Sequence, residues 1–363
     1  MKKLLVFVLS LVMVMSFAGC SQNAPTASSE TATSEAKPSE PSSNETKEAE
    51  PAAEKKVLAV VMPNATHGFL GESIKHAEDA TKKLAQQYGF EYKFLTSGES
   101  SEQNNQLDTL INEKVSCIVL WPHNGDELRS GAQKVMDAKI PLIIYDRLIT
   151  GFKPTAEVMG DNVTIGQETG KYFNKYFAEE LAKGEVNILE FKGDNSTVPQ
   201  QRSDGFKETA DKNIKVVQQF STDWQRAKAQ EQMETFLNTS DVKEIEKIKA
   251  VFTHDDEVVL GVLDAISNYK GTAKLDIRVV SGVGGRRENL DTFKSYKEKY
   301  NIDQVTYLFS PTMVRDAVEY GVKVLNGEEV SGLYLIDTQE ITLENEQEFR
   351  KSDTWKIRYE SGL

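Results

Sequence analysis

The sequence lacks several features that would mark common classes of protein. Cysteine is scarce: only Cys20 and Cys117 occur, almost a hundred residues apart, which excludes a disulfide framework and a cysteine-rich metal site. Positive charge is also scarce, because 43 Lys and Arg face 56 Asp and Glu and give a formal net charge of -13. Binding to nucleic-acid phosphates needs clustered Lys and Arg, so no nucleic-acid partner is expected, and small neutral ligands fit better.

No long apolar run occurs inside the chain, but a short one lies at its start. Two lysines precede an apolar run over residues 4–14, an order typical of an export signal. The run is too short to span a bilayer comfortably, which disfavours an anchor helix. The tetrapeptide FAGC that ends at Cys20 resembles the bacterial lipoprotein box, although that pattern usually has Leu where Phe17 stands. The resemblance implies a signal peptide over 1–19 and acylation of Cys20; a plain secretory signal is the alternative.

The segment 21–54 contains no aromatic residue, no Gly and no Val, Ile, Leu or Met. Such a segment cannot bury enough apolar surface to offset the entropy lost on ordering. It also holds four of the ten prolines, which favour an extended chain over a collapsed one. We therefore predict that residues 20–55 comprise the acylated cysteine and a disordered tether rich in Ser, Pro and Glu.

From Lys56 onward, short apolar runs alternate with segments of helical periodicity. Five or six consecutive apolar residues are typical of strands buried on both faces of a parallel sheet, and the intervening segments place apolar residues on one helical face. The predicted strands cover 57–62, 116–121, 141–145, 186–191, 214–220, 249–253 and 276–281. The alternation restarts after residue 160. This pattern predicts an α/β fold with two similar lobes, each a doubly wound parallel sheet.

Polar side chains follow several of these strands. Ligands of open α/β sheets bind beyond the carboxyl ends of the strands, so these positions are candidates for a site. Asp146 and Arg147 directly follow an apolar strand, where a buried acid and base either pair with each other or face a polar cleft. The other candidates at strand ends are His67, Phe69, Asn195, Arg202, Trp224 and Asp255. Charged groups bind paired hydroxyls and an indole stacks on a sugar ring, so the set predicts a sugar site.

Five stretches of the chain form a recognisable pattern. They are PHNG at 122–125, IPLIIYDRLI at 140–149, GDNVTIGQ at 160–167, QQRSDGF at 200–206 and VFTHDDEVVLGVLDAI at 251–266. Their order and spacing resemble those of the sugar-binding proteins of ABC importers, the type I periplasmic binding proteins that include the ribose- and xylose-binding proteins. The resemblance covers the chain from Lys56 to about Thr338.

The resemblance implies two lobes joined by three hinge crossings, near 160–162, 309–311 and 337–338. The sugar then lies between the lobes and is captured by hinge closure, for which periplasmic binding proteins are a standard example. The implied lobes comprise 56–160 with 310–337, and 161–309 with 338–363.

The resemblance also implies roles for individual residues. Asp146 and Arg147 match the acid–arginine pair of the family, and Arg202 matches the arginine before the Gly-Phe of its helix. Trp224 stands where an aromatic ring stacks on the sugar, and Asp255 stands where an Asn or Asp binds hydroxyls. The predicted ligand-binding residues are His67, Phe69, Asp146, Arg147, Asn195, Arg202, Trp224, Asp255 and Phe309.

Two positions depart from the family pattern. Gly284 stands where the family often has a ligand-binding Asp, and Phe309 stands where a Gln or Lys often reaches the sugar. Fewer hydroxyl partners, more room and more apolar surface predict a ligand that is bulkier or less polar at that end than ribose.

The remaining motifs give little support for a cofactor or metal site. The glycines of 282–285 lack the spacing of a dinucleotide-binding loop. One histidine and three acids follow one another over 254–257 at a helix start, and consecutive residues there cannot easily converge on one metal ion. For Trp121 and Trp355, packing is favoured, with a place in the cleft wall as the alternative. Cys117, inside an apolar strand, is expected to be an inert buried thiol. We therefore expect no metal ion and no cofactor.

The sequence thus predicts a monomeric, lipid-anchored solute-binding protein on the extracytoplasmic face of the cell membrane. It would capture a monosaccharide or small sugar derivative and deliver it to the membrane subunits of an ABC permease. The alternative partner is a membrane sensor kinase or chemoreceptor. An enzyme is disfavoured because no nucleophile or acid–base pair is recognisable, and a transcriptional repressor is excluded by the export signal.

Overall fold

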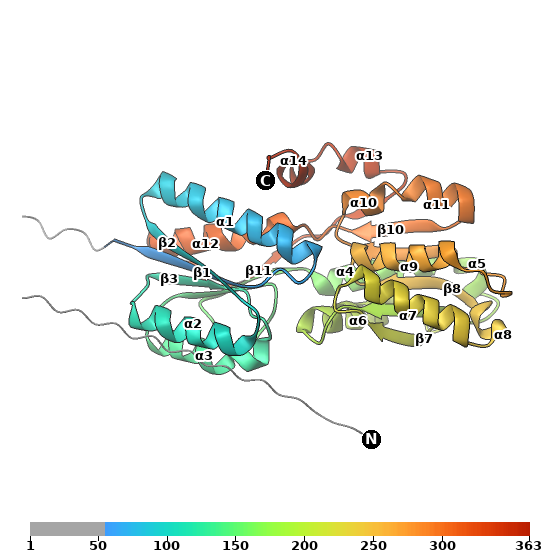
Figure 1. The fold of residues 1–363 in the computed structure, drawn as a ribbon, viewed down its shortest axis with the longest axis horizontal. Coiled ribbons are helices and arrows are strands. Elements are labelled where there is room, and N and C mark those ends of the chain that lie inside the picture. The colour runs from blue at the N-terminus through green and yellow to red at the C-terminus, as the bar shows by residue number, and fades with distance from the viewer. Residues whose placement is uncertain (1–54) are drawn as a thin grey trace, which may run out of the picture. The chain divides into compact units, whose positions relative to one another are not determined.

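The computed structural model describes residues 55–363. The predicted signal peptide, Cys20 and nearly all of the predicted tether lie outside the described residues. Within the described range, no helix combines the length and the apolar character that crossing a membrane requires. Residues 55–363 contain two six-stranded sheets, each flanked by helices, which we call the first and second lobes (Figure 1). The predicted fold class is confirmed.

The first sheet has the strand order β11-β5-β4-β3-β1-β2, and all of its pairings are parallel. Its strands are β1 (Val57–Pro63), β2 (Glu91–Ser97), β3 (Cys117–Leu120), β4 (Leu142–Tyr145), β5 (Ala156–Gly160) and β11 (Gly332–Ile336). Its helices are α1 (Gly68–Tyr88), α2 (Ser100–Asn112), α3 (Gly125–Asp137) and α12 (Val314–Leu325), the last preceded by the short 3-10 helix η1 (Pro311–Met313).

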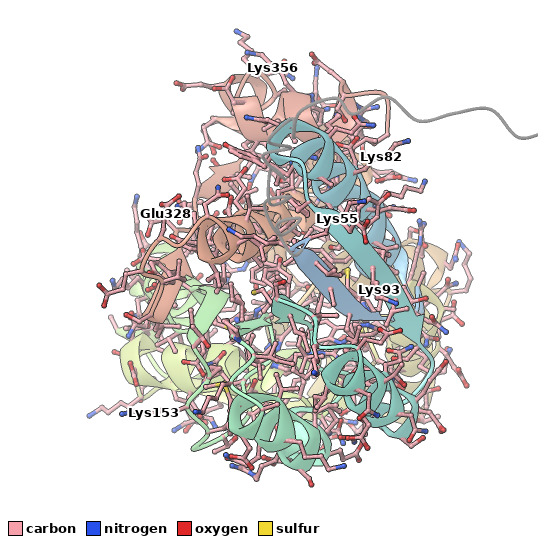
Figure 2. All side chains as sticks on the ribbon, turned by 90° about the vertical axis from the view of Figure 1, so that its left-hand side faces the viewer. Lys55, Lys82, Lys93, Lys153, Glu328 and Lys356 are labelled. Carbon is pink, nitrogen blue, oxygen red and sulfur yellow. The ribbon has the colours of Figure 1, made fainter. Side chains whose placement is uncertain are left out.

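Successive residues of β1 pack on opposite faces of this sheet. Leu58 and Val60 belong to one apolar cluster with side chains of α1 and α12, whereas Ala59 and Val61 belong to another with side chains of α2 and α3. Figure 1 shows these two pairs of helices on the two sides of the sheet. Both faces are buried, which explains why β1 is an uninterrupted apolar run. The exposed Lys82 of α1 points outward from this lobe (Figure 2).

The second sheet has the strand order β12-β10-β9-β8-β6-β7 and is parallel except for the antiparallel pairing of β10 with β12. Its strands are β6 (Val186–Lys192), β7 (Ile214–Ser221), β8 (Ile248–Thr253), β9 (Val279–Val283), β10 (Asp303–Tyr307) and β12 (Glu340–Thr342). Its helices are α4 (Asn162–Tyr176), α5 (Ala178–Leu181), α6 (Thr197–Thr209), α7 (Arg226–Thr239), α8 (Val242–Ile245), α9 (Asp256–Asn268), α10 (Arg287–Leu290), α11 (Phe293–Tyr300), α13 (Glu346–Phe349) and α14 (Asp353–Tyr359).

Within the described range the chain passes between the two sheets three times. The passages run from β5 to β6, from β10 to β11 and from β11 to β12. The carboxyl ends of parallel strands meet at one edge of a sheet, so the residues that follow these strands are brought together. The exact lobe boundaries given above stay a prediction.

The seven predicted strands are all present with shifts of a few residues at their ends, the largest at β9, which runs over Val279–Val283. The strands β2, β5, β10, β11 and β12 were not predicted. β2 and β11 are edge strands of the first sheet, and β11 leaves Leu333 and Leu335 about half exposed. An edge strand packs on fewer neighbours, so its sequence lacks the continuous apolar run that identifies a central strand.

Candidate functional site: a pocket lined by both lobes

Eleven residues from both lobes line one pocket. They are His67, Phe69, Trp121, Asp146, Arg147, Val198, Arg202, Trp224, Asp255, Val283 and Phe309. Eight of the nine predicted ligand-binding residues are in this set, and Asn195 is the exception. The structure therefore brings together side chains that lie up to about 240 residues apart in the sequence.

The strand ends explain why these residues meet. Trp121 directly follows β3 and Asp146 directly follows β4 in the first lobe, whereas Asp255 lies just beyond β8 and Val283 ends β9 in the second lobe. Each sheet thus presents the carboxyl ends of its central strands to the pocket, which is the usual position of a ligand in an open α/β sheet.

Two pocket residues have left-handed backbone conformations. The φ angle is 65° at Asp146 and 63° at Trp224, which follows Asp223 at 49°. Such conformations are costly for residues other than Gly and tend to occur at functional sites. A Cβ on Gly193 would lie 2.1 Å from the Trp224 ring, so only glycine leaves space for the indole in this position.

Two carboxylates face the pocket. Asp146 is 6% exposed, and its one ion pair among the described residues is a long one, 3.9 Å to Arg147 Nε. Asp255 caps the start of α9 by accepting a hydrogen bond from the backbone N of Glu257 at 2.7 Å. Burial raises the pKa of Asp146 to about 6, and burial, with the charge of Asp256, raises the pKa of Asp255 to about 7. Hydroxyl donors from a ligand would stabilise both charges.

Arg202 is oriented from three sides and is 2% exposed. Its Nε donates to Asn162 Oδ1 at 2.9 Å, and its Nη1 donates to the backbone carbonyl of His254. The guanidinium also lies 4.8 Å from the ring centre of Phe309 and 5.7 Å from that of Trp224. Burial lowers its pKa to about 10, so it remains a cation at neutral pH. Among residues 55–363, no hydrogen bond is found for its remaining nitrogen, Nη2, which leaves a donor for a ligand.

Arg147 is held across the lobes. Its Nη2 lies 2.8 Å from Asp194 Oδ2, and its Nη1 donates to the backbone carbonyls of Pro122, at 3.4 Å, and His123. The sequence analysis left open whether Asp146 and Arg147 pair with each other. The structure shows that Arg147 pairs mainly with Asp194, so Asp146 keeps most of its capacity to accept hydrogen bonds.

Aromatic rings form the walls of the pocket. The Phe69 ring centre lies 5.4 Å from that of Phe309 and 6.0 Å from that of Trp121, and His67 lies 6.3 Å from Trp224. Burial and the nearby charge of Arg147 lower the pKa of His67 to about 4, so its imidazole is neutral. Within the described range its Nδ1 is buried without a hydrogen-bond partner, which leaves a further polar atom for a ligand.

Asn195 does not line the pocket, and its predicted role stays a prediction. Asn195 borders a neighbouring hollow that shares His67, Arg147 and Trp224 with the pocket. It is the preceding residue, Asp194, that reaches Arg147, and its other oxygen accepts from the backbone N of Ser196 at 3.0 Å. That turn points the carboxylate toward the first lobe.

Gly284 does not line the pocket, although the residue before it, Val283, does. Gly284 has a φ of 145°, and a Cβ there would lie 3.1 Å from Asp256 Oδ2. Since adjacent residues of a strand face opposite sides, the apolar Val283 side chain occupies the pocket wall. This part of the wall is therefore apolar, and the role expected from the departure at Gly284 stays a prediction.

Trp121 and Val198 were not predicted to lie in the site. The sequence analysis favoured packing for Trp121, although its place at the end of an apolar strand is the signal that marks the other site residues. Trp355 does pack as expected, against Phe349 and Tyr359. Cys117 is fully buried, and burial raises its pKa to about 12.

Known proteins share this arrangement. A family described as a periplasmic binding protein domain matches residues 58–329. The ribose import binding protein of Salmonella typhimurium is 28% identical over 295 residues, which cover 79% of this chain and 90% of the relative. That of Bacillus subtilis is 28% identical over 229 residues, which cover 62% and 70%. A solved ABC transporter solute binding protein from Bacillus halodurans with bound myo-inositol has a TM-score of 0.69 and 26% identity, covering 84% of this chain and 98% of that one.

The fold and the site define a two-lobed α/β binding protein with its pocket at the strand ends of both sheets. The chain belongs to the periplasmic binding protein family, type I, and is homologous to solute-binding proteins of ABC importers.

Proposed function

We propose that this protein captures a sugar between its two lobes and delivers it to an ABC permease. The observation that carries the proposal is the convergence of Asp146, Asp255 and Arg202 on one pocket walled by aromatic rings. The relatives named ribose import binding proteins, and the solved relative with bound myo-inositol, support a polyhydroxylated ligand.

The chemistry of the pocket matches such a ligand. Carboxylates accept hydrogen bonds from hydroxyls, and a guanidinium donates hydrogen bonds to hydroxyl oxygens. Each charged group can therefore bind particular hydroxyls of a sugar ring. Aromatic faces cover the C–H face of the ring. The acids and arginines already balance one another, which favours a neutral ligand over an ionic one.

The proposal includes the location of the protein. Acylation of Cys20 would anchor the chain on the extracytoplasmic face of the membrane, and the segment 20–55 would hold the folded part away from it. The signal-like N-terminus and the family membership support this location. The folded part would act as a monomer that closes on its ligand around the three crossings between the sheets.

A thermal-shift screen of the purified protein tests the proposal. The panel is D-ribose, D-xylose, D-allose and myo-inositol. A ligand present at about 100 times its Kd stabilises the folded state by about 2.7 kcal/mol. We expect at least one member to raise the melting temperature and to be recovered chemically intact after incubation. Failure of every sugar to bind would contradict the proposal, and chemical conversion of a sugar would favour an enzyme.

A further inference from the structure

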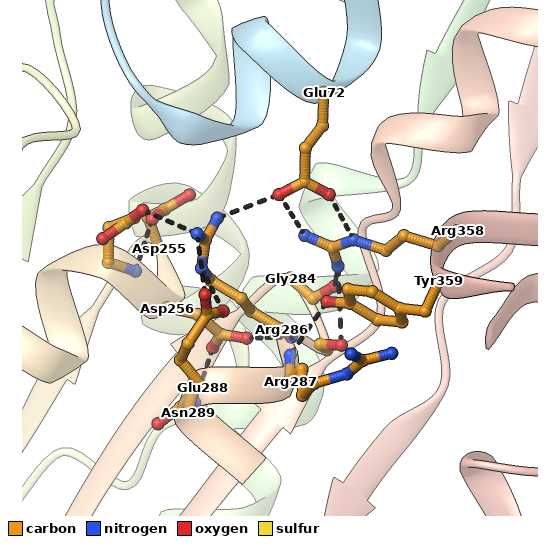
Figure 3. Close-up of polar contacts among 12 residues, drawn as sticks. Glu72, Asp255, Asp256, Gly284, Arg286, Arg287, Glu288, Asn289, Arg358 and Tyr359 are labelled. Atoms are coloured by element: carbon orange, nitrogen blue, oxygen red, sulfur yellow. Dashed lines mark hydrogen bonds and ion pairs between the residues drawn. The ribbon is translucent and has the colours of Figure 1, made fainter. Parts of the chain in front are cut away.

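Arg358, in the C-terminal helix α14, contacts both lobes at once. Its Nε donates to Glu72 Oε2 at 2.7 Å, and its Nη2 donates to Glu72 Oε1 at 3.2 Å. Its Nη1 donates to the backbone carbonyls of Gly284, at 3.1 Å, and Gly285, at 3.4 Å (Figure 3). Glu72 belongs to α1 of the first lobe, whereas the glycines follow β9 of the second lobe. One guanidinium therefore joins the two lobes.

A second arginine reaches the same carboxylate. Arg286 Nη1 lies 3.0 Å from Glu72 Oε1, and its Nη2 lies 3.2 Å from Glu257 Oε1. The backbone N of Arg286 donates to Asp256 Oδ2 at 2.6 Å. Glu72 is thus the single acid of the first lobe in a cluster whose other labelled members in Figure 3 come from the second lobe.

The Arg358–Glu72 ion pair is largely buried, which strengthens it. The side chain of Arg358 is 4% exposed and that of Glu72 is 28% exposed. Burial alone would raise the pKa of Glu72, but the hydrogen bond and charge of Arg358, together with the charge of Arg286, hold it below its ordinary value. A bidentate guanidinium–carboxylate pair in such surroundings is stronger than an exposed one. Removing Glu72 leaves the buried Arg358 without an acidic partner among the described residues.

The helix that carries Arg358 is anchored in the second lobe. Trp355 packs in an apolar cluster with Leu290, Phe293, Ile341 and Phe349. In addition, the Tyr359 hydroxyl accepts from the backbone N of Arg287 at 2.8 Å. The second lobe thus holds α14 through Trp355 and Tyr359, while Ile357 of the same helix borders a hollow together with Met313 and Arg315 of the first lobe.

The cluster lies directly behind the pocket walls. Glu72 is three residues after Phe69 on the same helix, so both lie on one face of α1. Gly284 immediately follows Val283, and Phe69 and Val283 both line the pocket. A Cβ on Gly68 would lie 2.7 Å from Glu257 Oε1 and 2.8 Å from Arg286 Nη1, so the two walls approach closely here.

From this geometry we propose that Arg358 is a positioning residue for ligand capture: by holding Glu72, it stabilises the arrangement in which both pocket walls face the ligand. The inference rests on the proposed function. The apparent affinity equals the intrinsic affinity multiplied by the fraction of molecules in the binding-competent arrangement, so a smaller fraction gives a weaker apparent affinity. Arg358 therefore raises affinity without touching the ligand.

The test compares Arg358→Gln and Glu72→Gln in the full mature protein. Calorimetry with the tightest-binding sugar of the panel should show Kd raised at least about tenfold, mainly through faster dissociation. The double variant should be little worse than Glu72→Gln alone, because Glu72→Gln already removes the pair with Arg358 together with the pair with Arg286. The matched control is Glu180→Gln, which breaks the Arg278–Glu180 pair of 2.6 Å within the second lobe and should leave Kd unchanged.

A structural readout separates this inference from the proposed function. Spin labels at Lys82→Cys in the first lobe and Lys212→Cys in the second, in a Cys20→Ser background, report the distance between the lobes. Without ligand, Glu72→Gln should shift the distances toward longer values, and this holds even if no sugar of the panel binds. Parent-like distances in Glu72→Gln and Arg358→Gln, or a parent-like Kd in both, would overturn the proposal. Glu72→Gln keeps every contact of Arg358 with the second lobe, so it serves if Arg358→Gln does not fold.

Discussion

Arg147 of the first lobe and Asp194 of the second lobe form an ion pair of 2.8 Å at the edge of the ligand pocket. The side chain of Arg147 is 8% exposed and that of Asp194 is 21% exposed, so the pair is largely shielded from water. It lies at the pocket itself, whereas the Glu72–Arg358 pair lies behind its walls. The two lobes are therefore joined by ion pairs at two separate places.

The first prediction concerns Asp194→Asn. This change keeps the shape of the side chain but removes the counterion of a buried arginine, which is strongly unfavourable. We expect sugar affinity to fall by at least about tenfold, as measured by calorimetry. Asp204→Asn is the control, since Asp204 is exposed and contacts Lys207 at 3.7 Å and Gln200 Nε2 at 2.8 Å, both within α6. Unchanged affinity in Asp194→Asn would show that the pair does not contribute to capture.

The second prediction concerns residues proposed to contact the ligand directly. Arg202→Ala removes a buried donor, and a ligand hydroxyl left without its partner costs roughly 1 to 3 kcal/mol. We expect Kd to rise by at least about tenfold for Arg202→Ala, and likewise for Asp146→Ala and Trp224→Ala. Circular dichroism should show that each variant remains folded. Parent affinity in all three variants would remove the site assignment.

How far the sequence leads can be judged from particular residues. The apolar runs of β1, β3 and β4 fix the central strands because burial on both faces demands them. The strand-end rule then locates Asp146 and Asp255, and the family resemblance adds Arg202 and Phe309. Asp194 and Val283, which reach Arg147 and line the pocket, each lie one residue before the position that the sequence analysis singled out, because a slip of one residue reverses the direction of a side chain while leaving the motif intact.

Contacts between distant segments could not be predicted in this way. Glu72 and Arg358 are 286 residues apart, and neither lies in a stretch that resembles the family motifs. Their pairing depends on where α14 packs, which is decided by the apolar cluster around Trp355. Periodicity and motif spacing describe local structure, so they carry no information on such a contact.

The third prediction concerns pH. In the ligand-free protein the pKa of Asp146 is raised from 3.8 to about 6 and that of Asp255 from 3.8 to about 7, chiefly by burial. Groups with raised pKa values stabilise the fold fully below pH 3.8, and this contribution is lost as pH rises through 6 to 7. Ligand hydroxyls favour the ionised carboxylates, so binding should release protons and Kd should fall between pH 5 and pH 8.

Calorimetry in buffers of different ionisation enthalpy measures this proton release. His67, with a pKa of about 4, and Arg202, with a pKa of about 10, do not change charge across this range. The variant Asp146→Asn should lose part of the pH dependence. A Kd that is constant from pH 5 to pH 8 would contradict the assigned role of the two carboxylates.

The fourth prediction concerns the N-terminus, which lies outside the described residues. If Cys20 is acylated, the protein should partition with membranes after cell fractionation, and Cys20→Ser should be released or kept uncleaved. One acyl chain binds a membrane only marginally, so stable retention implies more than one chain. Equal membrane association of both forms after signal cleavage would rule out the lipid anchor.

The last prediction concerns which sugar binds. Val283 and Phe309 form an apolar part of the pocket wall, and the resemblance implies that the family often has polar groups at Phe309 and at Gly284, next to Val283. A hydroxyl of ribose directed at this wall would be buried without a hydrogen-bond partner, and an unpaired buried hydroxyl weakens binding strongly. Ribose should therefore bind weakly despite the similarity to ribose import binding proteins, and Val283→Asp should improve ribose binding by at least about tenfold. Val283→Ala controls for space alone and should not do so. A ribose Kd near or below about one micromolar in the parent protein would show that other groups of the pocket supply the missing partner.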